Sequence, residues 1–238
     1  MKQAKSKIEV KGFEARYYDH LMNLITFFTY PKFIRDAIRE MNISKGEKIA
    51  DFGAGTGRNA MLMRKYVGED GFIIGVDIGE EMKEQFLKRA SKYDNVFLFE
   101  QSIDEIMEAR HFLVGQSLPE RFKKYREGFL FDRVFISFVL HGFEQHQRIL
   151  IIQNAYHILR DGGELDILDW NERDVDSSSW FTRLIFNKLE CALAKDFVER
   201  NWSDILDSYG FKIIGEKLFY RGLVRLLRAR KVEELNID

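Results

Sequence analysis

The chain alternates short apolar runs with longer amphipathic stretches over its central part. The apolar runs of strand length are residues 48–52, 72–76, 96–99, 133–139 and 164–168. Apolar positions with helical spacing fill residues 59–67, 80–91 and 145–159 between them. Strands that alternate with helices build a mostly parallel sheet with helices on both faces. The pattern therefore predicts an α/β fold.

Two segments lie outside this alternation. Residues 1–44 contain the apolar spacing of two helices broken near Pro31, and we expect them to form a helical lid. Residues 104–130 stand where a short connection would suffice, and 117–120 have the pattern of a capping box before an amphipathic stretch. We expect a helical insertion there, before the fourth strand of a main domain that spans 45–238.

The C-terminal part predicts one more helix and a hairpin. An amphipathic helix at 202–209 stops at Gly210, a residue type that ends helices readily. Runs at 211–220 and 223–230 predict two final strands, which bring the sheet to seven. Basic residues gather here, at Arg221, Arg225, Arg228, Arg230 and Lys231. They favour a solvated edge strand, where positive charge blocks sheet-to-sheet pairing, over contact with a membrane or an acidic partner.

Composition narrows the class of protein. The 238 residues suit one domain with a small lid, and the formal net charge of -1 gives no general attraction to nucleic acid. Cys191 is the only cysteine, so a disulfide framework is excluded. His146 and His157 lack ligand spacing with any acid, so no metal is expected. The polar, lysine-rich start is no signal peptide and no apolar run reaches membrane length, so we expect a cytoplasmic protein.

The segment that follows the first strand carries glycines at three alternate positions, Gly53, Gly55 and Gly57. Glycine tolerates positive φ and has no Cβ, so the backbone can approach a ligand closely. Asp51 lies at the end of the first strand and Asp77 ends the second, where an acid can accept hydrogen bonds from two ribose hydroxyls. A nucleoside-like cofactor is therefore favoured over a purely structural turn.

The spacing of the loop distinguishes between cofactors. A dinucleotide site needs Gly-x-Gly-x-x-Gly, but the sixth position holds Arg58, and Gly57 comes one place early. The Gly-Lys-Ser/Thr sequence of a phosphate-binding P-loop is missing. S-adenosylmethionine has no pyrophosphate and carries an ammonium group. An acid at Asp51 therefore suits S-adenosylmethionine better than it suits NAD.

These residues resemble the class I S-adenosylmethionine-dependent methyltransferases over nearly the whole chain. The loop Asp51–Gly57 is similar to the first motif of that family, and 131–141 and 159–165 are similar to its fourth-strand and fifth-strand motifs. The likeness is greatest to the ubiquinone/menaquinone C-methyltransferase type, a methyltransferase type 11-like domain, because 17–23 resembles its Tyr-Asp…Met-Asn segment. The resemblance implies a Rossmann-like, seven-stranded, mostly parallel sheet with one antiparallel strand.

The resemblance also implies a set of cofactor-binding residues. Asp51 would attract the ammonium group through a backbone amide or water, and Asp77 would hold the ribose. Ser102 and Ile103, with Gln101 before them, stand where relatives carry an Asp or Asn and a small residue to hold the adenine amine. The full expected set is Asp51, Gly53, Ala54, Gly55, Thr56, Gly57, Asp77, Ile78, Met82, Gln101, Ser102, Ile103, Ser137 and Phe138.

Three residues are candidates for catalysis. His141 follows the fourth strand, and histidine is the residue type suited to proton transfer near neutral pH, so it is the candidate general base, although packing in a loop explains it equally well. Asp169 ends the fifth strand and could orient the substrate or cap a helix. Tyr18 belongs to the expected lid. Aromatic residues such as Phe28 and Phe33 fit core packing better than a tunnel for an apolar tail.

The leading hypothesis is methyl transfer from S-adenosylmethionine, with S-adenosylhomocysteine as product, to a small apolar or aromatic acceptor, with quinone-like C-methylation favoured. Methylation of RNA or protein is the alternative within the same chemistry. A catalytically silent cofactor-binding protein and a nicotinamide-dependent dehydrogenase are alternatives from other classes. The expected partner is a small molecule, with no nucleic acid and at most peripheral membrane contact; a homodimer is left open.

Overall fold

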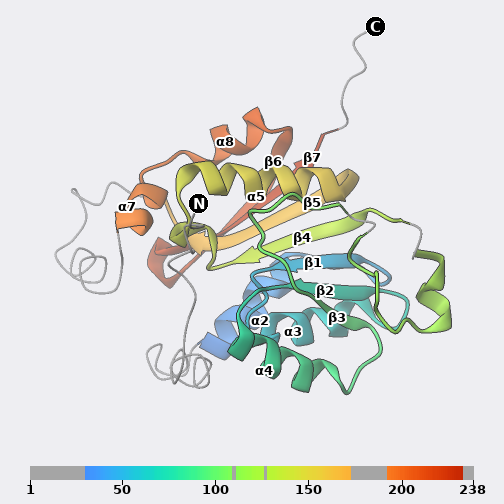
Figure 1. Ribbon diagram of the computed structural model, residues 1–238. Coiled ribbons are helices and arrows are strands. Elements are labelled where there is room, and N and C mark those ends of the chain that lie inside the picture. Colours follow the sequence, from blue (N-terminus) through green and yellow to red (C-terminus); the bar gives the residue numbers. More distant parts are fainter. Residues whose placement is uncertain (1–29, 109–110, 126–127, 173–191, 233–238) are drawn as a thin grey trace, which may run out of the picture.

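The computed structural model describes residues 30–108, 111–125, 128–172 and 192–232, and seven strands form one sheet in them (Figure 1). The strand order is β3-β2-β1-β4-β5-β7-β6. Only β7 runs antiparallel to its neighbours β5 and β6, which confirms the predicted mostly parallel sheet. The strands are β1 (Lys48–Phe52), β2 (Phe72–Val76), β3 (Val96–Phe99), β4 (Phe131–Ser137), β5 (Leu159–Trp170), β6 (Phe211–Phe219) and β7 (Val224–Lys231).

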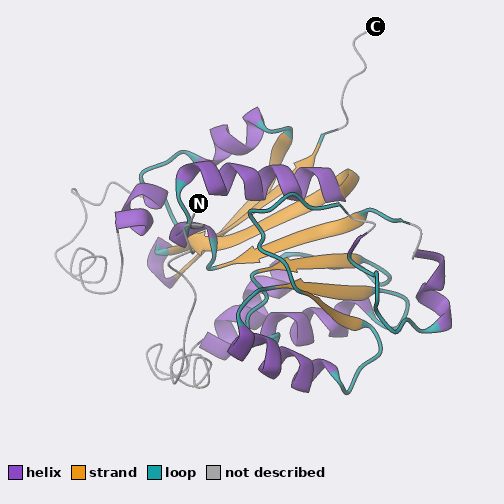
Figure 2. Cartoon of the chain, viewed as in Figure 1, coloured by secondary structure: helices purple, strands orange, loops and turns teal. Residues whose placement is uncertain are grey.

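Helices cover both faces of the sheet (Figure 2). One face packs against α2 (Tyr30–Glu40), α3 (Arg58–Val67) and α4 (Glu80–Ala90). The other packs against α5 (Gln145–Ile158) and α8 (Trp202–Ser208), with α7 (Ala192–Val198) at its end. Both faces of β1 and β2 are thereby buried, which explains why β2 is continuously apolar and why Asp51 of β1 is buried with its strand.

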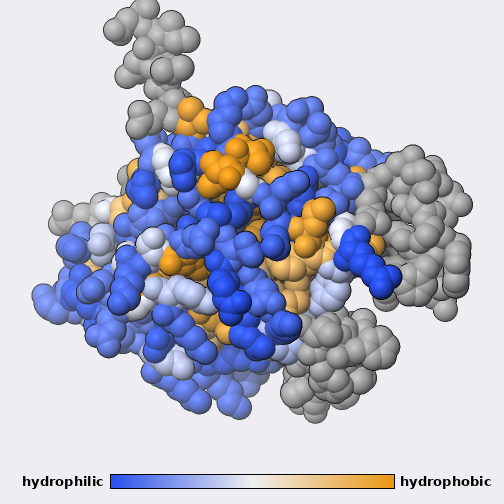
Figure 3. Space-filling model, turned by 180° about the vertical axis from the view of Figure 1, so that it is seen from behind, coloured by the Kyte–Doolittle hydropathy of each residue, from blue (hydrophilic) through white to orange (hydrophobic). Residues whose placement is uncertain are grey.

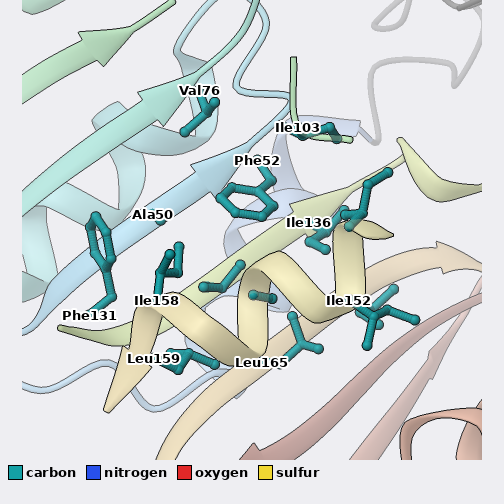
Figure 4. Packing of buried hydrophobic residues seen from close by; sticks show 14 of the residues in the cluster. Ala50, Phe52, Val76, Ile103, Phe131, Ile136, Ile152, Ile158, Leu159 and Leu165 are labelled. Atoms are coloured by element: carbon teal, nitrogen blue, oxygen red, sulfur yellow. The ribbon is translucent and has the colours of Figure 1, made fainter. Parts of the chain in front are cut away.

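The α5 face holds a large hydrophobic core. Ile152 and Ile158 of α5 lie over the strands, close to Ile136 and Leu165 (Figure 4). In the described part of 104–130, buried Phe112 and other apolar side chains complete this core, and η2 (Glu120–Tyr125) is a 3-10 helix. The amphipathic helix that was expected after the capping box is therefore a short 3-10 helix. Most of the apolar side chains that this segment adds to the core come from turns.

The second of the two expected N-terminal helices is α2. Its residues Tyr30 and Phe33 are 8% and 6% exposed and belong to the hydrophobic core on this face; this confirms the core interpretation for Phe33, whereas Tyr30 also lines a cavity. The expected first helix, Tyr18 and Phe28 lie outside the described residues, so the lid stays a prediction.

Two features of the C-terminal half differ from expectation. Strand β5 begins at Leu159, because Leu159 pairs with Phe131 before the register shifts to Arg133 and Glu164. The basic strand β7 lies between β5 and β6 and is not an edge strand. Its arginines do not repel neighbouring sheets; they form ion pairs with acids of adjacent elements.

One such network surrounds Arg133 at the amino edge of the sheet. The Arg133 guanidinium is 3% exposed and bonds to Asp166, to Glu47 at 2.9 Å and to Glu164 at 2.9 Å. Burial would lower the pKa of Arg133, but these carboxylates outweigh burial and raise it. Burial raises the pKa of Asp166, and Arg133 opposes that shift. The arginine therefore compensates for carboxylates that would otherwise be buried without a counter-charge.

The surface opposite to the view of Figure 1 is mainly hydrophilic, with hydrophobic residues confined to small separate patches (Figure 3). Across the part of the chain that the structure describes, every helix is too short or too polar to cross a membrane.

Candidate active site

A cavity opens at the carboxyl edge of the sheet, where β1 and β4 lie side by side. The chain turns in opposite directions from this pair, so the cavity occupies the switch point at which α/β folds bind ligands. The loops that follow β1, β2, β3 and β4 all reach it. Its wall consists of Tyr30, Gly53, Ala54, Gly55, Thr56, Arg58, Asn59, Val76, Asp77, Ile78, Gly79, Met82, Gln101, Ser102, Ile103, Ser137, Phe138, Val139 and Phe143.

The three glycines of the loop after β1 have different roles. All have positive φ: 70° at Gly53, 52° at Gly55 and 76° at Gly57. A Cβ on Gly55 would meet nothing nearer than a backbone oxygen at 4.0 Å, so this glycine opens the wall to a ligand. A Cβ on Gly57 would lie 2.7 Å from the ring of Phe86, and Gly57 does not line the cavity. Gly57 is therefore needed for the turn into α3 and for its packing.

Gly57→Ala is expected to destabilise the fold by about 2–3 kcal/mol, because it combines a strained left-handed backbone with overpacking against Phe86. Chemical unfolding measures this loss. Gly46→Ala is the matched control, since Gly46 has φ 82° but open space around the Cβ position. Gly46→Ala should lose only the stability that a left-handed backbone costs a residue with a side chain, about 1 kcal/mol. Equal losses in the two variants would show that Phe86 gives way freely.

Two charged side chains hold the loop in place. Asp77 accepts hydrogen bonds from the amides of Gly55 at 2.7 Å and Gly79 at 2.8 Å. Arg89 of α4 donates to the carbonyl of Thr56 at 2.7 Å and also to its hydroxyl. The carboxylate of Asp77 thus stands in the cavity wall beside a preformed glycine loop, the position expected for a ribose acceptor.

Asp51 lies behind this wall and not in it. Its carboxyl is 1% exposed, and Oδ2 has no hydrogen-bond partner among the described residues. Burial, with a smaller contribution from the negative charge of Asp77, raises the pKa of Asp51 to about 8. At neutral pH the Asp51 carboxyl is therefore largely protonated and presents little negative charge to the cavity.

The residues after β2 and β3 form the far end of the cavity. Ile78 is 53% exposed at its rim, whereas Met82 and Ile103 are buried and offer apolar surface. The Gln101 amide donates to the carbonyl of Ile106 at 2.9 Å, and the Ser102 hydroxyl donates to Asp104. Both polar side chains expected near an adenine amine are thus engaged within the protein.

The other end of the cavity is aromatic. Phe138 follows β4 with φ 53°, an uncommon value for a residue with a side chain, and its amide donates to the carbonyl of Leu168 at 2.8 Å. Its ring lies 5.8 Å from that of Trp170 and 6.1 Å from that of Phe33, measured between centroids. The left-handed backbone turns the chain at the end of β4, three residues before His141.

The structure brings His141 and Asp169 together. Nδ1 of His141 lies 2.8 Å from Oδ1 of Asp169, which also accepts the amide of Trp170 at 2.8 Å. Oδ2 of Asp169 accepts the amide of His141 at 3.3 Å. The sequence named both residues but not their contact, which depends on β4 and β5 being neighbours. Neither residue is part of the cavity wall itself.

The sequence missed several wall residues. Val139 and Phe143 follow β4 in the same loop as His141, and Tyr30 comes from α2. Arg58, used only to exclude a dinucleotide, lines the cavity with its guanidinium 5.0 Å from the centroid of the Tyr30 ring. Its place directly after the glycine loop was the available signal. Among the described residues, no cluster of three or more His, Cys, Asp or Glu side chains could hold a metal ion.

The comparison with known families decides the class of this site. The model of the ubiE/COQ5 methyltransferase family matches residues 2–202. The chain belongs to this family. It is therefore an S-adenosylmethionine-dependent methyltransferase.

Individual relatives of this methyltransferase agree with that assignment. The demethylmenaquinone methyltransferase of Listeria monocytogenes is 23% identical over 194 residues, which are 78% of this chain and 72% of the relative. A SAM-dependent methyltransferase from Aquifex aeolicus has a TM-score of 0.57 at 16% identity, covering 82% of this chain and 88% of that one. Aeropyrum pernix fibrillarin with bound S-adenosylmethionine has a TM-score of 0.50 at 16% identity, covering 78% and 67%.

The cavity of this methyltransferase fits the cofactor. The open side of Gly55 admits a chain that passes close to the backbone, and the half-buried carboxylate of Asp77 suits a diol. Apolar side chains at Met82 and Ile103 suit the faces of a base.

Proposed function

We propose that this methyltransferase transfers a methyl group to a carbon of a small aromatic acceptor of the quinol type. The aromatic end of the cavity, where Phe138, Phe143 and Tyr30 stand in the wall, carries this proposal. The demethylmenaquinone methyltransferases among its relatives support it, because they act on an acceptor of this kind. S-adenosylmethionine, when bound, supplies an activated methyl group on a sulfonium centre.

The residues of the chain have three tasks in this reaction. Asp77 and the backbone at Gly55 would hold the donor, and Ser137 and Phe138 would contribute wall to its binding site. The rings of Phe138 and Phe143 hold the acceptor in line with the methyl group and exclude water, which is the main contribution an enzyme makes to such a displacement. His141 removes a proton from the acceptor.

A screen of acceptors tests the proposal. The full chain is incubated with methyl-tritiated S-adenosylmethionine and with quinols, phenols and amines, and the labelled products are identified by mass spectrometry. We expect transfer to a ring carbon of quinols. Transfer only to amines, or to RNA or protein substrates offered in parallel, would contradict the proposed acceptor.

Asp77→Ala is expected to weaken S-adenosylhomocysteine binding by about 1–3 kcal/mol, because charge-assisted hydrogen bonds to the ribose are lost. Titration calorimetry measures the affinity. Glu80→Ala is the control, since the Glu80 side chain is 82% exposed on α4, the helix that follows Asp77. Unchanged affinity in Asp77→Ala would show that the ribose binds elsewhere, and tight binding of NAD to the wild type would contradict the cofactor-binding roles given to the loop.

A further inference from the structure

The loop that carries His141 is fixed from two sides by buried charged groups. Asp169 of β5 binds both the ring and the amide of His141. Arg148 of α5, fully buried, donates to the carbonyl of Leu140 at 2.9 Å and to that of His141 at 3.4 Å. Arg148 also forms a salt bridge with Asp196 of α7 at 2.5 Å. These charge-assisted hydrogen bonds fix the backbone of η3 (Leu140–Gly142) and the His141 ring, and they therefore hold the imidazole in one orientation.

The contact with Asp169 also determines which nitrogen of His141 carries the proton. The two Asp169 oxygens accept hydrogen bonds from two backbone amides, and Oδ1 also lies 2.8 Å from Nδ1 of the imidazole. A buried carboxylate is an acceptor, so Nδ1 of His141 must donate to it. Nε2 then carries the lone pair, and the carboxylate stabilises the imidazolium that forms when Nε2 takes a proton.

The imidazole lies behind the aromatic end of the cavity, outside the wall itself. Its centroid lies 6.3 Å from the Trp170 ring, which in turn lies 5.8 Å from the ring of Phe138 in the cavity wall. The adjacent loop residues Val139 and Phe143 are also in that wall. The His141–Asp169 pair is therefore one ring beyond Phe138 and belongs to the same loop as the wall residues Val139 and Phe143.

We infer that Asp169 is a positioning residue that makes His141 the general base for an acceptor bearing a ring hydroxyl, an inference that rests on the proposed function. The hydroxyl proton passes to Nε2 of His141 as an adjacent ring carbon forms its bond to the methyl carbon. The methyl–sulfur bond breaks with its electron pair staying on sulfur. The ring then loses the proton of the methylated carbon to water and becomes aromatic again.

The first test reads the tautomer without any turnover. In the ¹⁵N-labelled full chain, long-range ¹H–¹⁵N spectra report which imidazole nitrogen is protonated, and His141→Asn assigns the signal. We expect Nδ1–H in the wild type and a shift toward Nε2–H in Asp169→Asn, because the carboxylate acceptor is gone. The Nε2–H form in the wild type, or an unchanged spectrum in Asp169→Asn, would overturn the inference.

The second test separates positioning from a purely structural role. Asp169→Asn is expected to lower kcat on a quinol by about 10²-fold or more, the size of a general-base contribution, with the acceptor KM and the affinity for S-adenosylhomocysteine changed less than about 3-fold. Asp161→Asn, at a carboxylate that is 63% exposed, should match the wild type. Wild-type kcat in Asp169→Asn, or an equal loss of cofactor affinity, would contradict a positioning role. A wild-type enzyme inactive on every hydroxylated ring would instead contradict the proposed function, while the spectra would still decide the role of Asp169.

Discussion

Replacing Arg133 by methionine is expected to destabilise the protein by about 3–5 kcal/mol, because removing one partner of a buried ion pair leaves the other charge uncompensated. The substitution keeps an apolar chain of similar length in the core and deletes the guanidinium that bonds Asp166, Glu47 and Glu164 together. Asp166 is completely buried and would keep its contact with Arg228, 3.3 Å away. Urea unfolding monitored by circular dichroism measures the loss.

Two further variants make this measurement specific. Arg39→Met removes an exposed arginine that pairs with Asp36, and it should cost less than about 1 kcal/mol. Asp166→Asn in the Arg133→Met background should recover part of the loss, because it removes the uncompensated charge. A cost in Arg133→Met no larger than in Arg39→Met would mean that water reaches the network and replaces the arginine.

Asp51→Asn is expected to stabilise the protein increasingly as the pH rises from about 4 to about 8. The carboxyl of the unfolded chain ionises near pH 4, whereas the folded carboxyl keeps its proton until about pH 8, because burial and then Asp77 raise its pKa. A raised folded pKa means that stability is fully present below the unfolded value and declines as the pH rises through this window. At about 1.4 kcal/mol per pH unit, the wild type loses up to about 5 kcal/mol that the amide does not lose.

The difference between the two unfolding free energies, measured at pH 4.5, 6 and 8, isolates Asp51 from all other titrating groups. It should grow with pH in favour of Asp51→Asn. Asp70→Asn, on the exposed loop before β2, is the control and should show a flat difference. A flat difference for Asp51→Asn as well would mean that the folded protein holds this carboxyl as an anion with an unidentified partner.

The strands that flank the glycine loop were predictable from sequence because the signal is local. β1, β2 and β3 have the expected boundaries, since a strand buried on both faces is apolar throughout. The length of β5 was underestimated, because residues 160–163 have the composition of a turn. The pairing of Leu159 with Phe131 shows that the strand extends through them. Pairing across a sheet is non-local and leaves no periodic trace in one segment.

The difference between local signals and non-local contacts also explains which predictions about charged and wall residues were right. The arginines of β7 were interpreted as charges that protect an edge strand from pairing with another sheet. A run of basic residues in the sequence does not reveal that Glu164 and Asp166 lie opposite them. The wall residues in the glycine loop and at Asp77 were found because a short motif positions them. Phe143 and Tyr30 were missed because only the tertiary fold brings their loops to the cavity.

Because β7 runs antiparallel to β5, the start of β7 lies at the same edge of the sheet as the cavity. Because β7 starts at the carboxyl edge, the β6–β7 connection returns the chain to the vicinity of the cavity, and Phe219 and Tyr220 there each lie 5.0 Å from the ring of Phe33. The glycine loop and Asp77 precede residue 80, whereas this hairpin is among the last elements of the chain. The last elements of the chain thus support the ring of Phe33, which packs against Phe138 in the cavity wall, so under the proposed function substitutions in this hairpin would alter the acceptor end without touching the glycine loop or Asp77.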